Sequence, residues 1–331
     1  MFKFFKLLFF STLITGSLIS ISSLSWFSTW IGLEINLLSF IPLMKTPSNK
    51  YSSESISKYF MTQAMASFIL LFSIIMFTNS KVFNMDLTNL TSILMSSAIF
   101  MKMGAAPLHF WFPEVASGIS WNSNLILLTW QKLAPMIILS YMSLMPSLMI
   151  MFILSSSIIG SLLGLNQTCM RKILAYSSIN HISWMVSSLM CSINTFLIYF
   201  TIYSFMNLVI INNLKMWKIS FMSQINMMKN NPQKLVFVMN LFSLGGLPPF
   251  VGFIPKWMTI NQLSNNSMFF LTTMLIIFTL ITLFFYLRIS FSSLTLYTNN
   301  TIFNLNKNNI YQSIILLLST PIIVIMSSMM T

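Results

Sequence analysis

Four ionisable side chains interrupt long apolar stretches of this sequence. Glu34 and Lys132 each lie in the middle of such a stretch, and Lys102 and Lys256 each stand beside a segment that contains glycine and proline. One charge at the centre of a membrane helix costs about 2.5–3.5 kcal/mol on insertion scales. Four of them cost on the order of 10 kcal/mol before pairing or hydration, which is comparable to the net stability of a protein. We therefore infer that these charges serve a function.

Proton exchange is the chemistry that suits these residue types best. A buried lysine readily lowers its pKa and a buried carboxyl group raises its own, so both can exchange protons near neutral pH. Glu34 is the only one of the four acidic residues in the middle of an apolar stretch, which makes it the available partner for Lys102. Opening such an ion pair would release or capture a proton. A row of such groups joined by water would form a proton relay.

Structural explanations of the same residues compete with the relay. Each charged side chain could belong to a structural ion pair, or could snorkel, extending so that its charged end reaches the membrane surface. The latter alternative is strongest for Lys256, whose depth depends on where its helix breaks. His181, in the middle of residues 172–191, could relay protons or form a hydrogen bond between helices. His109 and Glu114 flank the first break, where they could admit protons or lie in a solvated turn.

The composition defines the class of protein. Only 6% of the 331 residues are charged and 56% are hydrophobic, whereas a soluble domain carries about 25% charged residues. Unbroken apolar runs of about 20 residues predict a polytopic all-α membrane protein rather than a β-barrel. The net charge of +13 does not indicate nucleic-acid binding, because the basic residues lie in short loops between apolar spans, as the positive-inside rule predicts.

Eleven candidate transmembrane helices follow from the apolar runs. They cover roughly 4–23, 26–44, 57–78, 88–106, 121–144, 147–165, 172–191, 194–214, 234–263, 268–289 and 310–330. The fourth meets Gly104 and Pro107, and the ninth contains Gly245–Pro249. We expect both to be discontinuous, with freed backbone groups facing protein or water. The basic and apolar N-terminus resembles a signal peptide, but with so many spans behind it we expect a retained first helix.

The loops predict an orientation and an internal repeat. With these eleven spans, thirteen of the 17 basic residues lie on the side of the membrane that holds the N-terminus. Only Lys81 lies on the other side, and three lie within spans. The N-terminal side is therefore the cytoplasm-like or matrix-like one. The broken spans are five apart, an odd offset that inverts the topology of the second set. We expect one transmembrane domain made of two inverted five-helix repeats, residues 1–145 and 146–290, followed by a loop and a C-terminal helix over 291–331.

Several kinds of site are missing from the sequence. It has no phosphate-binding Walker loop, no dinucleotide-binding glycine fingerprint, no cysteine cluster for an iron–sulfur centre and no paired histidines for haem. The energy for pumping must therefore come from a gradient or from another chain. Cys169 and Cys191 lack the spacing of metal ligands, and we expect two ordinary thiols.

Six sequence segments, taken together, are highly specific for one protein family. They are Trp30–Asn36, Lys102–Pro113, Trp130–Pro135, Gly164–Gln167, Ser177–His181 and Leu244–Phe250. With them the chain resembles the chain 2 family of mitochondrially encoded NADH–ubiquinone oxidoreductase, antiporter-like subunits in the membrane arm of respiratory complex I. The resemblance covers nearly the whole chain and is weakest in the C-terminal span.

This resemblance implies an antiporter-like fold and a specific proton path. The family assigns the path to a glutamate in the second span and to lysines in the fourth, fifth and ninth, which correspond to Glu34, Lys102, Lys132 and Lys256. It implies a multi-pass protein of the mitochondrial inner membrane with its N-terminus in the matrix. Its partners would be lipids and other complex I subunits, among them chains 4L and 4, in a hetero-oligomer without nucleic acid. NAD, FMN, iron–sulfur clusters and ubiquinone would be held elsewhere in the complex, and no cofactor by this chain.

The resulting hypothesis is a proton-translocating subunit of NADH:ubiquinone oxidoreductase that is driven by quinone reduction in neighbouring subunits. The Glu34–Lys102 pair opens or closes, Lys102 passes charge to Lys132, and Lys132 communicates with Lys256. His181 is a further candidate for the relay. Two alternatives use the same charges: a stand-alone cation/proton antiporter, and a structural scaffold of the membrane arm.

Overall fold

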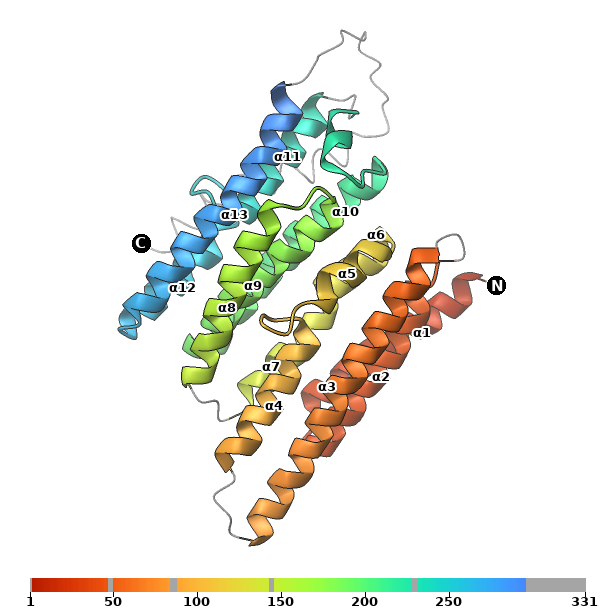
Figure 1. The fold of residues 1–331 in the computed structure, drawn as a ribbon, viewed down its shortest axis with the longest axis vertical. Coiled ribbons are helices and arrows are strands. Elements are labelled where there is room, and N and C mark those ends of the chain that lie inside the picture. Colours follow the sequence, from red (N-terminus) through yellow and green to blue (C-terminus); the bar gives the residue numbers. More distant parts are fainter. Residues whose placement is uncertain (1, 47–49, 84–87, 143–145, 228–230, 296–331) are drawn as a thin grey trace. The chain divides into compact units, whose positions relative to one another are not determined.

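The computed structural model describes residues 2–46, 50–83, 88–142, 146–227 and 231–295, and within these ranges the chain is almost entirely helical (Figure 1). The elements are α1 (Phe2–Ser22), α2 (Trp26–Met44), α3 (Lys50–Phe83), α4 (Thr88–Met103), α5 (Trp111–Gly118), α6 (Trp121–Leu128), α7 (Trp130–Ser140), α8 (Pro146–Leu165), α9 (Met170–Cys191), α10 (Ile193–Met216), the 3-10 helix η1 (Met222–Met227), α11 (Asn231–Gly245), α12 (Phe253–Asn265) and α13 (Phe269–Thr295). The predicted all-α class is confirmed.

The helix boundaries follow the apolar runs of the sequence. Among the described residues, six helices are long and apolar enough to cross a membrane by themselves: α1, α2, α3, α8, α10 and α13. The fourth and ninth expected spans are divided, into α4 and α5 and into α11 and α12, at the glycine-proline segments. The fifth expected span is also divided, at Thr129 between α6 and α7, which the sequence did not predict. The last expected span, 310–330, lies outside the described residues.

The chain forms two compact units, Met1–Ile159 and Gly160–Thr331. In the first unit, α3 packs against α2, α4 and α5, and α7 packs against α1, α4 and α6. The backbones of α1 and α2 approach closely, because a Cβ atom on Gly32 would lie 2.6 Å from the backbone nitrogen of Ser20 and 2.8 Å from the carbonyl oxygen of Gly16. Small residues allow such close packing between membrane helices. This contact fixes the face of α2 from which Glu34 projects.

The second unit is built around α9, which packs against α10, α12 and α13. Every residue from Ser177 to Ser188 is buried. The serine hydroxyls in this stretch donate to backbone carbonyls three residues earlier in the same helix, at 2.6–2.9 Å. Because their hydrogen-bonding capacity is used locally, these serines can be buried at low cost. The interior of this unit is therefore polar along α9 without carrying charge there.

Candidate proton-relay site

Helix α4 ends at a left-handed glycine within a buried stretch of the chain. Gly104 has φ +74°, and the amide of Ala105 donates to the carbonyl of Phe100 at 3.0 Å. This is the usual way to end a helix, and it favours glycine because other residues are strained there. A Cβ atom on Gly104 would also lie 3.0 Å from the side chain of Phe112. The break places Lys102 in the last turn of α4.

Side chains from other helices bind the carbonyl groups that this break exposes. Trp111 donates its indole N–H to the carbonyl of Met101 at 3.1 Å, and Gln63 donates its amide to the carbonyl of Lys102 at 3.2 Å. Ser155 donates to the carbonyl of Ala106 at 2.8 Å. Backbone carbonyls without partners are costly in a membrane, so these bonds stabilise an irregular backbone beside Lys102.

Lys102 and Glu34 form a loose, buried ion pair. Lys102 Nζ lies 3.9 Å from Glu34 Oε1, and the two side chains are 4% and 25% exposed. The distance is too long for a direct hydrogen bond, and neither atom has a hydrogen-bond partner among the residues that the structure describes. A buried charge with unused hydrogen-bonding capacity favours a bridging water. Each end of the pair can therefore take a new partner without breaking a direct bond.

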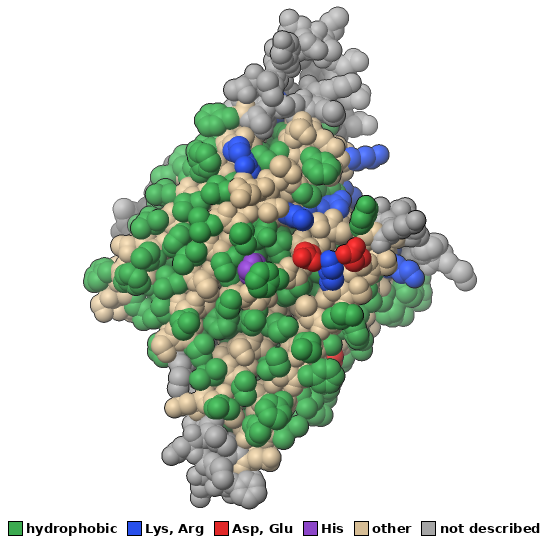
Figure 2. Space-filling view, in the orientation of Figure 1, with side chains coloured by type: hydrophobic (Ala, Val, Ile, Leu, Met, Phe, Trp, Pro, Cys, Tyr) green, Lys and Arg blue, Asp and Glu red, His purple; other side chains and the backbone are tan. Residues whose placement is uncertain are grey.

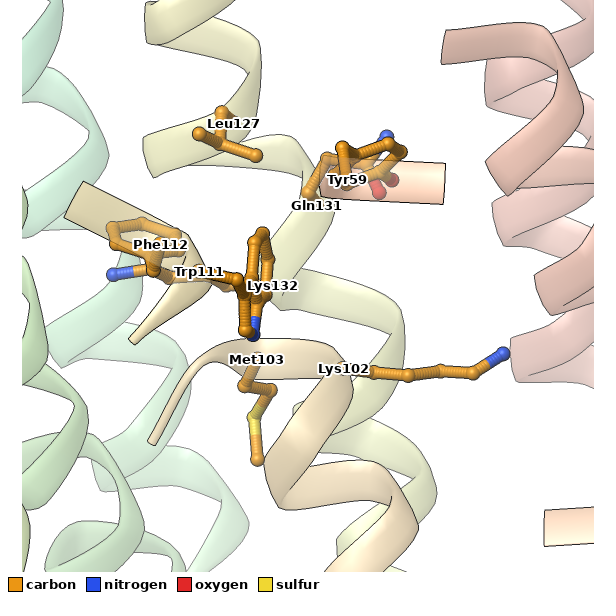
Figure 3. A pocket seen from close by; sticks show the side chains of 8 residues that line it. All are labelled: Tyr59, Lys102, Met103, Trp111, Phe112, Leu127, Gln131 and Lys132. Atoms are coloured by element: carbon orange, nitrogen blue, oxygen red, sulfur yellow. The ribbon is translucent and has the colours of Figure 1, made fainter. Parts of the chain in front are cut away.

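Lys132 lies deeper, in the first turns of α7. Its residue is 1% exposed, and its Nζ lies 5.3 Å from the centre of the Phe112 ring, within the range of a cation–π contact. A small cavity adjoins it, with room for about one water. The lining residues are Tyr59, Lys102, Met103, Trp111, Phe112, Leu127, Gln131 and Lys132 (Figure 3). Lys102 and Lys132 thus border the same small cavity.

Helix α11 in the second unit ends in the same manner as α4. Gly246 has φ +80°, and its amide donates to the carbonyls of Phe242 and Ser243, both at 3.0 Å. The chain then turns through Leu247 to Val251 and re-enters a helix at Phe253. In both units a helix therefore stops at a left-handed glycine and its last carbonyls point into the unit.

Lys256 binds the carbonyl end of this broken helix. From the first turn of α12 its Nζ donates to the carbonyl of Gly245 at 2.8 Å and to that of Leu244 at 3.3 Å. The same nitrogen lies 5.9 Å from the centre of the Trp184 ring. A helix C-terminus carries partial negative charge, which stabilises a cation there. Lys256 is 5% exposed, so its ammonium is bound inside the unit instead of extending to the surface.

Comparison with known proteins identifies the family. A family model described as NADH:quinone oxidoreductase/Mrp antiporter, TM, matches residues 23–282. NADH-ubiquinone oxidoreductase chain 2 of Locusta migratoria is 44% identical over 331 residues, which cover 98% of this chain and 97% of that protein. The corresponding protein of Anopheles gambiae is 48% identical over 316 residues, 94% of this chain and 92% of its own length. This chain belongs to the NADH-ubiquinone oxidoreductase chain 2 family.

Two solved structures share the fold of this chain. A chain of respiratory complex I from Thermus thermophilus superposes with a TM-score of 0.84 at 20% identity, covering 96% of this chain and 76% of its own length. A chain of the Mrp complex from Dietzia sp. DQ12-45-1b superposes with a TM-score of 0.73 at 17% identity. The match covers 85% of this chain and 59% of the Mrp chain. At these identities the similarity shows the fold alone, and it confirms the predicted antiporter-like architecture.

The structure divides the predicted site residues of this chain 2 family member between the units. Glu34, Lys102 and Lys132 lie together in the first, and Lys256 and His181 in the second. Nδ1 of His181 lies 2.9 Å from the hydroxyl of Tyr199, and its ring stacks at a tilt on Tyr203 at 4.9 Å. This contact joins α9 to α10, so the hydrogen bond between helices that the sequence left open as an alternative is present.

The remaining acidic residues in the described part of the chain lie at its surface. Lys58 Nζ lies 2.8 Å from a carboxylate oxygen of Glu54 and 2.7 Å from one of Glu114, and all three side chains are exposed. Figure 2 shows two acidic side chains with a basic one between them on one face. Asp86 lies outside the described residues. His109 is 2% exposed and its Nδ1 contacts the carbonyl of Pro107 at 3.2 Å, so it lies in a buried turn.

Possible metal ligands and thiols can be located in the described residues. No group of three or more histidine, cysteine, aspartate or glutamate side chains could hold a metal ion within these ranges. Cys169 and Cys191 are both free thiols. The groups that meet at the site are the amines of Lys102 and Lys132, the carboxylate of Glu34 and the hydroxyl of Tyr59, and such groups can exchange protons.

Uncharged polar residues of the site were missed by reasoning from sequence. Gln131 donates its amide to the side-chain oxygen of Asn36 at 2.9 Å, which links the helix of Lys132 to the helix of Glu34. Gln63 and Tyr59 are four residues apart on one face of α3, and both are buried. A glutamine in the middle of an apolar run, next to a buried lysine or four residues from a tyrosine, is the signal that could have found them.

Proposed function

We propose that this chain translocates protons across the membrane as one subunit of respiratory complex I. As a member of the chain 2 family it is a membrane subunit of the enzyme NADH:ubiquinone oxidoreductase. The chain itself contributes no redox centre. NAD, FMN, iron–sulfur clusters and ubiquinone are bound by other subunits, whose quinone chemistry supplies the driving force. The relay residues are Glu34, Lys102, Lys132 and Lys256.

The observation that supports this proposal best is the state of the Glu34–Lys102 pair. A structural salt bridge would gain stability from short, direct hydrogen bonds. This pair is buried, 3.9 Å apart and without such bonds, an arrangement that costs stability and leaves both groups able to change partners. Such an arrangement suits a switch in which an approaching charge separates the pair and the lysine gives up its proton.

The order of transfer follows the depth of the residues. Lys102 gives its proton toward the cavity that it borders together with Lys132. Lys256 serves the second unit, where carbonyl oxygens rather than a carboxylate hold its charge. From Lys256 the proton leaves to the side opposite the N-terminus, or its charge acts on the next subunit. His181, bound to Tyr199, is a further station in that unit.

The proposed setting is the mitochondrial inner membrane. The excess of basic residues in the loops on the N-terminal side supports a matrix location for the N-terminus, because positively charged loops stay on the side of synthesis. The neighbours proposed for the chain are chains 4L and 4 of the same complex, together with lipids. The proposal includes the two inverted five-helix repeats over 1–145 and 146–290.

A matched pair of substitutions tests the function. Lys102→Met removes the amine and keeps most of the apolar stem, and Lys215→Met makes the same change at an exposed position of α10. In assembled complex reconstituted into liposomes, we expect Lys102→Met to lower the number of protons pumped per NADH oxidised. Lys215→Met should leave the ratio unchanged. A normal ratio with Lys102→Met would refute the relay, and a loss of assembly with a normal ratio in the remaining complex would favour the scaffold alternative.

A further inference from the structure

The first unit shows a gap in the relay as proposed. Lys102 and Lys132 both border the cavity, yet their ammonium groups point in different directions (Figure 3). Lys102 extends away from the cavity toward Glu34, and Lys132 extends toward Phe112 and Met103. A proton that leaves the Glu34–Lys102 pair therefore has no direct amine-to-amine path, and some other group must carry it into the cavity.

Tyr59 occupies the position that such a carrier requires. It projects from α3, is 2% exposed and lines the cavity together with Lys102, Gln131 and Lys132. Figure 3 shows it on the same side of the cavity as Gln131. Gln131, which lines the same cavity, donates to Asn36 on the helix that carries Glu34. Tyr59 therefore shares a cavity wall with Lys102, one member of the ion pair, and with a residue bound to the helix of the other member.

The ring of Tyr59 is held in a defined orientation. It makes edge-to-face contacts with Phe40 at 5.4 Å and with Trp111 at 5.8 Å between ring centres. Trp111 is in turn fixed by its indole bond to the carbonyl of Met101. Aromatic packing of this kind restricts the ring, so the hydroxyl stays at one place on the cavity wall. A relay group needs such a fixed position, because proton transfer depends on hydrogen-bonding distance.

We propose that the hydroxyl of Tyr59 carries protons between the Glu34–Lys102 pair and the cavity that adjoins Lys132. The inference rests on the proposed function. The ammonium of Lys102 gives a proton to the phenol oxygen, through a water where needed, while the phenol gives its own proton to a water in the cavity. That water protonates the neutral amine of Lys132. Lys102 ends as an amine, Lys132 as an ammonium, and the phenol and the water are regenerated.

A purely structural role for Tyr59 makes a different prediction about substitutions. Tyr59→Phe keeps both aromatic contacts and removes only the hydroxyl, so packing alone would tolerate it. Tyr59→His weakens those contacts but restores a group that donates and accepts protons. If Tyr59 only packs, the Tyr59→Phe variant should pump better than Tyr59→His. If its hydroxyl carries protons, Tyr59→His should pump better than Tyr59→Phe. Tyr51→Phe removes a hydroxyl from an exposed position of the same helix and is the matched control.

The experiment measures protons pumped per NADH oxidised and the solvent deuterium effect on pumping, per assembled complex in liposomes. We expect Tyr59→Phe to slow proton transfer through this subunit by about 100-fold, as for loss of a general acid–base group, and so to lower the ratio. Tyr59→His should recover part of it, and Tyr51→Phe should not differ from the unchanged protein. Normal pumping in Tyr59→Phe, or greater damage in Tyr59→His, would overturn the inference.

The same series separates this inference from the proposed function. If Lys102→Met abolishes pumping by this subunit while Tyr59→Phe pumps normally, the relay stands and Tyr59 has no part in it. If Lys102→Met itself pumps normally, the proposed function fails and the inference fails with it. Counting per assembled complex keeps the comparison valid even where a variant assembles in smaller amounts.

Discussion

Replacement of Gly246 by alanine should disturb Lys256 without touching that residue itself. Gly246 has φ +80°. A Cβ atom there would lie 2.8 Å from Cδ and 2.9 Å from Nζ of Lys256. The alanine would therefore strain the backbone and displace the ammonium from the carbonyls of Gly245 and Leu244. The neighbouring Gly245 is a matched control, because the nearest atom to its Cβ would be Tyr286 Cδ2 at 3.5 Å, an ordinary contact.

The size of the effect follows from two contributions. A residue other than glycine in the left-handed region costs roughly 1–2 kcal/mol. Loss of one hydrogen bond to a charged group costs about 1.5–3 kcal/mol, and the 2.8 Å bond from Lys256 to Gly245 is the shorter of the two. Together they destabilise this part of the folded variant by about 2.5–5 kcal/mol relative to the unchanged protein. Since about 1.4 kcal/mol is a factor of ten, the equilibrium constant that favours the native arrangement of this segment should fall on the order of 10²-fold or more.

The assay is proton pumping per NADH oxidised in assembled complex, measured for Gly246→Ala, Gly245→Ala, Lys256→Met and the double variant Gly246→Ala/Lys256→Met. We expect Gly246→Ala to reduce the ratio and Gly245→Ala to leave it near normal. If the damage acts through Lys256, the double variant should pump as Lys256→Met does. Equal damage from the two alanines, or clearly additive damage in the double variant, would refute the reasoning about this ammonium.

Three further substitutions test the surroundings of the first unit. Gln63→Leu leaves the carbonyl of Lys102 without its 3.2 Å bond and should lower stability by about 1–3 kcal/mol, measured as the thermal midpoint of the assembled complex. Gly32→Ala puts a Cβ atom 2.6 Å from the Ser20 backbone and should separate α1 from α2, reducing assembly on native gels. Lys58→Ala removes an exposed ion-pair partner, and we expect unchanged pumping per NADH because exposed pairs contribute little.

The helices and their breaks could be predicted because a backbone that crosses lipid must satisfy its own hydrogen bonds. Apolar runs of the required length become helices, and the glycine-proline segments after Lys102 and before Lys256 end them. The division at Thr129 was not predictable, since it contains neither glycine nor proline. Its backbone turns through φ −115° and ψ −75° between α6 and α7, a conformation that the local sequence does not require.

The contacts of the site show which details the sequence could not supply. That Glu34 and Lys102 would meet followed from counting acids, because no other acid lies in the middle of an apolar run. The carbonyl contacts of Lys256 depend on how the chain returns after Gly246, which a pattern of residue types does not define. Tyr59, Gln63 and Gln131 look like any polar residue in a membrane helix until the packing shows them around the two lysines.

The central claim is that the Glu34–Lys102 pair changes protonation during turnover. Infrared difference spectra of the assembled complex, recorded between rest and NADH-driven turnover, report this directly through the carboxyl and carboxylate bands. We predict bands of a carboxyl group that gains or loses a proton, absent in Glu34→Gln and altered in Lys102→Met. A spectrum in which Glu34→Gln removes no band, in complex that still pumps normally, would contradict the account.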